Sequence, residues 1–545
     1  MPRGKWKFFS WRTLMVFGFL VAVAYIPLAV RLRVLDYVAP IETWPWFLSG
    51  EVYDLLAQFR LEVLLGITTC LTMVALLYYY YKHDEGGIAP SYLDYPTAAF
   101  AALIALSALA SPYIHMAFWG FYERGEGAVA YFCYLLLFMI AATCLKGDGD
   151  KRVIFYGILA AGVIQALVAG GQYLGYDFLQ SDFYRPFLIP AEYVHLLEEG
   201  AELKARITTK AYGFTYNPNY LGGYMAMLFP MGLVLYLYSS SLYLAAAALV
   251  AVLLFGLGLA AALSSGAFLA LGMALIILFF LILRDIKFFY KRLIPLLLII
   301  VCLSVYAGPQ LGDLIQGQVK KLRASYSLLL DREGEEAEPN LGVKADFPHV
   351  KVGEPLSLAI ERHPLDSLAS GRGYIWRKSG ELLLQENLLL GSGLDTLLYN
   401  FPFWTADRAS SRRVGLLVDK PHNTYLQIGL GVGLPGLLLY LYMLGLHFVN
   451  YIRVYWRRGV QNSTDAVMLA IFAGWLAYLF QGLSNDSVLS NAPVFWVAFG
   501  LSVNYVQKHL PELAAPAVAA GKDDKRSKGR GKKTAKGEGP SRKRK

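Results

Sequence analysis

The sequence Val418-Asp-Lys-Pro-His-Asn-Thr-Tyr-Leu-Gln427 leads a polar segment directly into an apolar run that continues to Leu446. Proline and asparagine are common in the first positions of helices, so Pro421 and Asn423 predict a helix start here. The apolar run is long enough to cross a bilayer. We therefore expect the chain to turn at His422 and enter the membrane, with the imidazole at the depth of the lipid headgroups.

Similar apolar runs recur along the whole chain. It has 545 residues, of which 56% are hydrophobic, and a mean hydropathy of +0.43. These values exclude a soluble fold. They predict an all-α polytopic membrane protein with about twelve transmembrane helices. The candidate spans lie near residues 14–30, 61–81, 96–115, 127–144, 153–172, 217–237, 242–263, 266–283, 293–308, 424–446, 464–484 and 488–506.

Basic residues predict the orientation of these spans. They cluster beside short loops at Arg3–Arg12, Lys146–Arg152, Arg284–Arg292 and Arg453–Arg458, which all fall on one side when twelve spans are counted. Short loops rich in lysine and arginine remain in the cytoplasm. We expect a multi-pass protein of the cytoplasmic membrane with both termini inside and the long polar stretch 309–423 outside.

The sequence divides into four parts on this basis. Residues 1–308 are expected to form nine helices with short loops, 309–423 an external loop with surface helices, and 424–506 the last three helices. The first apolar run is too long for a signal-peptide core and lacks a small-residue cleavage site, so it is expected to remain as an anchor. Residues 507–545 predict a basic, disordered cytoplasmic tail. This tail carries much of the net charge of +10, which favours anionic membrane lipids over nucleic acid as its partner.

The external loop has two parts of different character. The part from Asp331 to Pro355 is acidic and rich in Gly and Pro, whereas Ser370–Asn387 has apolar residues at helical spacing. We expect this second part to lie along the membrane surface as a helix. Arg372 stands at its expected start, where free backbone N–H groups and a guanidinium would suit a phosphate. The structural alternative is an arginine that only reaches the headgroups.

Further polar residues fall on the same predicted face, and each has a structural alternative. Arg124 either contacts an anion or is neutralised by Glu123 and Glu126. The amides of Asn217 and Asn219 either cap a helix or hold a sugar hydroxyl. His422 itself is either a reactive group or a helix-start residue. The remaining candidates on this face are Asp395, Lys420 and Asn423.

The membrane spans contain almost no ionisable residues, and the two halves of the chain show no repeat. Ion-coupled transporters usually need charges inside the membrane, and many are built from inverted repeats. The pattern instead indicates a cationic site at the outer interface, suited to an anionic headgroup whose lipid tail lies in the bilayer. The four cysteines have no metal-ligand spacing and read as apolar filler.

Several motifs together resemble the O-antigen ligase and polymerase family. They occur in the family's order, with the large external loop before the histidine helix, and they cover most of the chain. The motifs are Glu123-Arg-Gly-Glu-Gly127, Phe214-Thr-Tyr-Asn-Pro-Asn-Tyr-Leu221, Ser370-Gly-Arg-Gly-Tyr-Ile-Trp376, Leu390-Gly-Ser-Gly-Leu-Asp395, Lys420-Pro-His-Asn-Thr-Tyr-Leu426 and Gly429-Leu-Gly-Val-Gly433-Leu-Pro-Gly436.

The resemblance implies a GT-C-like membrane glycosyltransferase. Its donor would be a glycan on polyprenyl diphosphate, such as undecaprenyl diphosphate, and its acceptor a hydroxyl on a lipid, a glycan or a protein. His422 would be the general base or orienting group, with Arg372 and Arg124 on the diphosphate and no metal or other cofactor. The other substrate-binding candidates are Lys420, Asn423, Asn217, Asn219 and Asp395. A polysaccharide polymerase, or a non-enzymatic transporter of lipid-linked sugar or a small anion, remains the alternative.

The sequence departs from the family at one position. Many members carry Ser-Arg-Gly-Ala at an outer turn, where this chain has Ser264-Ser265-Gly266-Ala267. An arginine expected to help hold the diphosphate is therefore replaced by Ser265. Lys420 and Arg124 are the candidates to supply the missing positive charge.

Overall fold

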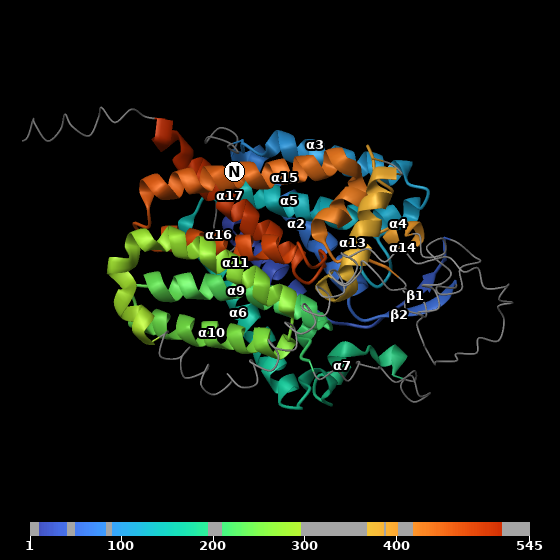
Figure 1. Cartoon of the computed structure of the whole chain (residues 1–545), viewed down its shortest axis with the longest axis horizontal. Coiled ribbons are helices and arrows are strands. Elements are labelled where there is room, and N and C mark those ends of the chain that lie inside the picture. Colours follow the sequence, from blue (N-terminus) through green and yellow to red (C-terminus); the bar gives the residue numbers. More distant parts are fainter. Residues whose placement is uncertain are drawn as a thin grey trace, which may run out of the picture.

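The computed structural model describes residues 10–40, 49–82, 90–194, 210–295, 368–385, 388–401 and 418–514. Long helices run alongside one another through most of this structure (Figure 1). The helices before the long connection are α1 (Trp11–Leu20), α2 (Gln58–Lys82), α3 (Asp94–Ala110), α4 (Ile114–Trp119), α5 (Ala128–Cys144), α6 (Asp148–Tyr173), α7 (Arg185–Leu188), α9 (Pro218–Tyr238), α10 (Leu242–Ala262) and α11 (Ser265–Ile282). Those after it are α13 (Leu368–Gln385), α14 (Leu397–Asn400), α15 (Thr424–Arg458), α16 (Ser463–Gln481) and α17 (Ala492–Ala514).

Eight helical segments of the described chain are long and apolar enough to cross a membrane. Two further apolar helices, α3 and α5, are shorter, with 17 residues each. The prediction of a helical, multi-pass membrane protein is confirmed. The predicted span at 293–308 lies almost entirely outside the described residues, so the count of twelve stays a prediction. The eight segments are Trp11–Leu28, Gln58–Tyr81, Asp148–Tyr173, Pro218–Tyr238, Leu242–Ala262, Ser265–Pro295, Thr424–Arg458 and Ser463–Gln481.

The described chain fits the predicted all-α class, with one short β-hairpin in addition. Strand β1 (Arg33–Tyr37) pairs antiparallel with β2 (Gly50–Asp54), in a register that sets Arg33 opposite Asp54 and Tyr37 opposite Gly50. Two five-residue strands leave no signal on a membrane-span window, which averages over a much longer stretch. The hairpin leads directly into α2, because the Asp54 carboxylate accepts hydrogen bonds from the backbone N–H groups of Ala57 and Gln58.

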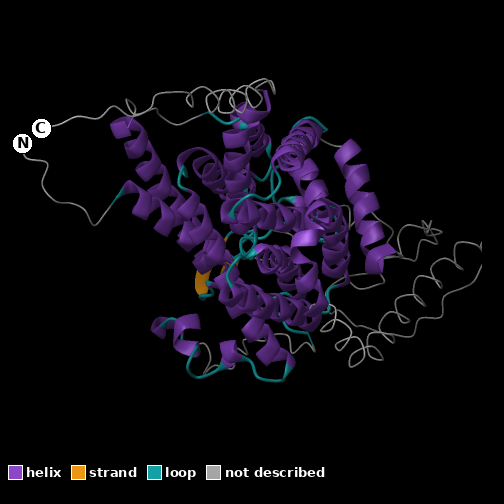
Figure 2. Cartoon of the chain, turned by 90° about the vertical axis from the view of Figure 1, so that its left-hand side faces the viewer, coloured by secondary structure: helices purple, strands orange, loops and turns teal. Residues whose placement is uncertain are grey.

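One end of the bundle is basic and is held together by polar contacts. Arg12 of α1 pairs with Asp150 of α6, and Lys508 of α17 pairs with Asp148, also of α6. Arg284, just after α11, donates to the backbone carbonyl of Trp456 near the end of α15. These contacts place the starts of α1 and α6 beside the ends of α11, α15 and α17, and we call this the basic end. Figure 2 views the bundle from this side.

The opposite end carries the hairpin, α7, α13 and α14 (Figure 1), and we call it the hairpin end. Helices α9 and α16 are the most enclosed of the eight segments, with 89% and 83% of an apolar 18-residue window buried inside the protein. They pack against each other. The start of α9 and the end of α16 therefore meet in the middle of the hairpin end.

Helix α15 contains a break at Gly433, which has φ +77 and ψ 175. A Cβ atom at Gly433 would lie 2.5 Å from the Leu389 carbonyl oxygen, so only glycine fits this close approach. The segment 388–393 is bonded along the first half of α15: the Leu434 N–H donates to Leu388, Ser392 N–H to Leu430 and Gly393 N–H to Gly431. The chain before the histidine helix is thus attached to that helix.

Two predicted boundaries need correction. Helix α13 begins at Leu368, so Arg372 lies in the second turn and does not stand at the helix start. Any contact of Arg372 with an anion therefore depends on its guanidinium and not on free backbone N–H groups. Helix α17 continues to Ala514, so the first residues of the predicted tail are helical. Residues 515–545, and the loop residues 309–367 and 402–417, lie outside the described chain.

Candidate functional site

His422 occupies a strained turn directly before α15. Its φ is +50, in the left-handed region that non-glycine residues seldom adopt. Asn423 caps the helix, because its side-chain oxygen accepts from the N–H groups of Tyr425 and Leu426 at 3.0 and 3.1 Å. The predicted turn and helix start are confirmed. The Asn423 amide also donates a 3.0 Å hydrogen bond to the Leu483 carbonyl.

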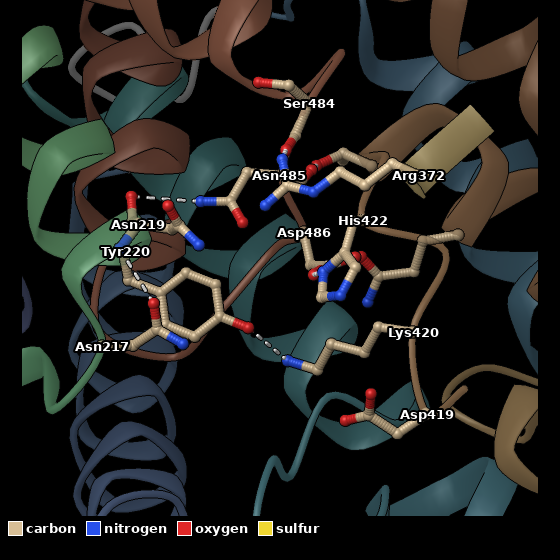
Figure 3. Close-up of polar contacts among 12 residues, drawn as sticks. Asn217, Asn219, Tyr220, Arg372, Asp419, Lys420, His422, Ser484, Asn485 and Asp486 are labelled. Atoms are coloured by element: carbon tan, nitrogen blue, oxygen red, sulfur yellow. Dashed lines mark hydrogen bonds and ion pairs between the residues drawn. The ribbon is translucent and has the colours of Figure 1, made fainter. Parts of the chain in front are cut away.

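The imidazole of His422 is held by a buried carboxylate. Its Nδ1 lies 2.8 Å from Oδ2 of Asp486, whose side chain is fully buried, whereas the His422 side chain is 33% exposed (Figure 3). In a neutral imidazole this contact places the proton on Nδ1 and leaves Nε2 as the free acceptor. The second carboxylate oxygen, Oδ1, has no hydrogen-bond partner in the described part of the chain. The pair therefore has an oriented, partly accessible basic nitrogen.

The first turn of α15 fixes the α16–α17 connection that carries Asp486. The Thr424 N–H donates to the Gly482 carbonyl at 2.8 Å, and the Thr424 hydroxyl donates to the Asn485 carbonyl at 3.0 Å. The Gln427 side chain accepts from the Ser487 N–H at 3.0 Å. These bonds flank Asp486 on both sides, so the carboxylate and the imidazole are positioned by the same helix start.

Lys420 places a buried positive charge two residues before His422. Its Nζ donates to the Tyr220 hydroxyl at 3.1 Å and lies 5.2 Å from the centre of the Tyr220 ring. Burial lowers the pKa of Lys420, but nearby Tyr220, Asp486 and Asp419 raise it, and the pKa lies above its ordinary value. The amine is therefore protonated at neutral pH.

Arg372 reaches the same group of residues from α13. Its guanidinium donates to the backbone carbonyl of Ser484, two residues before Asp486 (Figure 3). Burial lowers the pKa of Arg372, and nearby Asp486 and Tyr220 raise it less, yet a guanidinium stays charged in proteins. A neutral carbonyl does not cancel this charge. Arg372 thus adds a second cation beside the His422–Asp486 pair.

Arg124 forms ion pairs, but its partners differ from those expected. Its Nε donates to Asp395 and its Nη1 to Asp419, both at 2.7 Å, in place of Glu123 and Glu126. The side chains of Arg124 and Asp395 are only 5% and 3% exposed. Asp395 also accepts from the Phe121 N–H at 2.7 Å. Arg124 and Asp395 therefore anchor the chain immediately before Lys420, while Nη2 of Arg124 has no hydrogen-bond partner in the described part of the chain.

Asn217 and Asn219 line the site from the start of α9. Asn217 caps the helix by accepting from the Asn219 N–H at 2.8 Å. The Asn219 side chain accepts from the Ser264 hydroxyl at 3.1 Å, and its carbonyl accepts from the Asn485 amide at 3.2 Å. The turn with the missing arginine therefore borders the site, with Ser265 exposed beside it.

Glu126 is a buried acid next to this site. Its Oε1 accepts a 2.7 Å hydrogen bond from the Tyr134 hydroxyl. Burial raises the pKa of Glu126 to about 7, against smaller opposing effects from Tyr134 and Lys420. From the sequence alone, Glu126 was considered only as a possible ion-pair partner of Arg124.

The sequence predicted several segments that form the site, but it did not predict four residues that lie there. Tyr220, Ser484, Asn485 and Asp486 all lie at the site, three of them in the polar connection between α16 and α17. An aspartate in a short turn on the same predicted face as His422 was the signal that could have found Asp486.

The comparison with protein families gives one match. Residues 250–441 match the model of the O-antigen ligase family. This region contains Arg372, Asp395, Lys420, His422 and Asn423, whereas Arg124, Asn217, Asn219 and Asp486 lie outside it. No curated protein matches the chain. The matched region, the helical membrane fold and the polar site at the start of α15 agree with one another, and the match over residues 250–441 supports an assignment to the O-antigen ligase family.

Proposed function

We propose that this protein transfers a glycan from polyprenyl diphosphate to an acceptor hydroxyl on the outer face of the cytoplasmic membrane. The observation that carries the proposal is the His422–Asp486 contact of 2.8 Å beside two cations, Arg372 and Lys420. A base next to a cationic cluster suits a reaction in which a hydroxyl loses its proton and a diphosphate leaves.

The acceptor hydroxyl would be activated by His422. With Nδ1 facing Asp486, Nε2 takes the hydroxyl proton as the acceptor oxygen attacks the anomeric carbon of the donor sugar. The new bond joins the acceptor oxygen to that carbon, while the bond from the carbon to the diphosphate oxygen breaks. Asp486 keeps the ring in place and stabilises the imidazolium that forms. Attack opposite the leaving group inverts the anomeric configuration.

The diphosphate would leave with its charge stabilised by Arg372 and Lys420. A guanidinium can bind two phosphate oxygens at once, and Lys420 adds a point charge from the other side of His422. Arg124 is paired with Asp395 and Asp419, so Lys420 and Arg372 replace the family arginine absent at Ser265. Asn217 and Asn219, at the start of α9, are placed to hold sugar hydroxyls.

The distribution of charge supports this orientation in the membrane. Arg12, Arg152, Arg284 and Arg458 lie at the basic end, and short basic loops stay in the cytoplasm. The hairpin end, with His422, then faces outward. A lipid, glycan or protein acceptor uses the same chemistry, so attachment and polymerisation differ only in what brings the hydroxyl to His422.

The experiment is glycan transfer by purified protein in lipid nanodiscs, with a labelled glycan on undecaprenyl diphosphate. We expect acceptor-dependent release of undecaprenyl diphosphate, an inverted linkage, and a loss of roughly 10²–10⁴-fold in His422→Gln. Glutamine keeps a polar side chain but removes the base. Donor binding and melting temperature are measured on the same variant. Transfer at the wild-type rate by His422→Gln would exclude the proposed mechanism.

A further inference from the structure

A patch of large apolar side chains is exposed just after α6. Its members, with the exposed fraction of each residue, are Tyr173 (59%), Leu174 (84%), Tyr176 (61%), Phe183 (71%) and Phe187 (61%). Isolated exposed apolar residues are common, but five large exposed apolar side chains within one short segment indicate a contact surface. We call these five residues the aromatic shelf.

The opposite face of the same segment is firmly packed. Leu179, Leu188 and Ile189 are 0%, 5% and 3% exposed and belong to a hydrophobic cluster that includes Val30 and Phe214. The Leu32 N–H donates to the Leu188 carbonyl at 2.8 Å. The shelf is therefore the outer face of an ordered two-sided structure.

Ring contacts hold the exposed phenylalanines in place. The Phe183 ring lies 6.1 Å from those of Phe178 and Phe187, and Phe178 lies 5.3 Å from Tyr184. Such contacts stabilise aromatic side chains beyond the area they bury. They keep Phe183 and Phe187 on the outer face, although neither is covered by the protein.

The shelf continues the exposed apolar side of α6. This side carries Val153, Tyr156, Ile164 and Leu167, and α6 is long and apolar enough to cross a membrane. The shelf begins at Tyr173, the last residue of that helix. Figure 1 shows α7 at the hairpin end, to one side of the bundle. Aromatic side chains at the end of a spanning helix belong to the headgroup level.

We propose that the aromatic shelf inserts into the boundary between headgroups and acyl chains in the leaflet at the hairpin end. Its partner is the phospholipid surface itself. The five shelf residues supply the apolar contact, and the exposed side chain of Arg185, between Phe183 and Phe187 in sequence, suits lipid phosphates. This inference is independent of the transfer chemistry.

Hydrogen bonds join the segment that carries the shelf to the chain before α9. The Gln172 side chain accepts from the N–H groups of Tyr212 and Gly213 at 3.0 and 2.8 Å, and the Asp177 carboxylate accepts from the Tyr212 hydroxyl. Tyr184 packs edge-on against Phe214, at 5.8 Å between ring centres. Phe214 stands three residues before Asn217. The shelf thus sets the depth of the start of α9 relative to the lipid headgroups.

The test is a nitroxide label at Phe183 or Phe187, introduced as cysteine into the full chain with its four native cysteines replaced. In nanodiscs of phosphatidylethanolamine and phosphatidylglycerol, we expect collisions with oxygen to exceed collisions with a water-soluble nickel chelate at both positions. Glu51→Cys is the control, because Glu51 is exposed on the hairpin and away from the shelf. There the nickel chelate should dominate.

Two results would overturn the inference. Dominance of the nickel chelate at 183 and 187 would place the shelf in water, and exclusion of both reagents would mean that a polypeptide covers it. The melting temperature of each labelled variant is compared with that of its cysteine-free parent. Leu174→Cys gives a third position, which should follow 183 and 187 if the shelf is one surface.

Discussion

His422 and Asp486 are separated by 64 residues in sequence, yet Nδ1 of the imidazole lies 2.8 Å from the buried carboxylate. Asp486→Asn keeps the shape of the side chain but can donate a hydrogen bond to Nδ1, which favours the wrong tautomer. We expect transfer to fall by up to roughly 10⁴-fold, as it does when the carboxylate that orients a catalytic histidine is replaced by an amide. The loss should appear in kcat more than in the KM for donor, and the pH profile of kcat should change. An unchanged profile with a lowered melting temperature would reduce Asp486 to a structural residue.

Arg372→Lys tests the guanidinium on α13. Lysine keeps the charge but cannot hold the Ser484 carbonyl and a diphosphate with one planar group. Loss of one charge-assisted hydrogen bond corresponds to about 1.5–3 kcal/mol, so transfer should fall roughly 10–100-fold. Arg377→Lys is the matched control, because Arg377 lies on the same helix and pairs with Glu381 at 3.0 Å. Equal rates for both variants would remove Arg372 from the site.

We expect Arg124→Gln to lower the stability of the protein and to affect glycan transfer mainly through that loss. The substitution leaves the buried Asp395 carboxylate without its cation, and breaking a buried pair costs about 3–5 kcal/mol. We expect a large fall in melting temperature in detergent. The exposed pair of Arg33 and Glu62 offers a comparison, since Arg33→Gln should change the melting temperature little. A stable Arg124→Gln protein without transfer would instead make Arg124 a substrate ligand.

Glu126→Gln predicts a change in the pH dependence of stability. Burial raises the pKa of Glu126 from 4.5 to about 7, so the folded protein holds this proton more tightly than the unfolded chain. This contribution to stability is complete below about pH 4.5 and is lost as the pH rises towards 7. Glutamine has no such proton to lose. The melting temperature of the variant, relative to that of wild type, should therefore rise from pH 5 to pH 8. Glu123→Gln, at an exposed neighbour, should follow wild type throughout.

The proposed orientation predicts which positions react with a reagent that cannot cross the membrane. Cysteine at Glu51 on the hairpin should be labelled in intact cells, whereas cysteine at Gln461 beside the basic end should react only after the membrane is opened. Both side chains are exposed, so access to the reagent depends on the membrane alone. The reverse pattern would place His422 in the cytoplasm and contradict transfer on the outer face.

Apolar runs such as Leu242–Ala262 were predictable because a span is a local property of about 20 consecutive residues. The turn at His422 was also local, since Pro421 and Asn423 mark it within the sequence itself. Asp486 was not predictable in this way. The sequence of a polar turn between two spans does not show whether its aspartate faces water or contacts a histidine. The packing of α16 against the start of α15 brings Asp486 to His422.

The partners of Arg124 show the same limit. Sequence proximity favoured Glu123 and Glu126, but a turn at Gly125 and the close packing of Gly120 against Gly127 direct the arginine towards Asp395 and Asp419. Those carboxylates come from loops about 270 and 295 residues away. Ion pairs between distant loops depend on the whole fold. A single sequence therefore identifies the charged residue but does not predict its partner.

The backbone bonds between segment 388–393 and α15 have a consequence for how such proteins diversify. They fix the point where the chain returns to the histidine helix, so His422 keeps its place whatever the length of the connection between α11 and α13. A doubled loop length costs only about 0.6 kcal/mol in closure entropy. Insertions and deletions in that connection are therefore expected to leave the proposed site around His422 in place, so the length of the connection can vary in evolution without loss of that site.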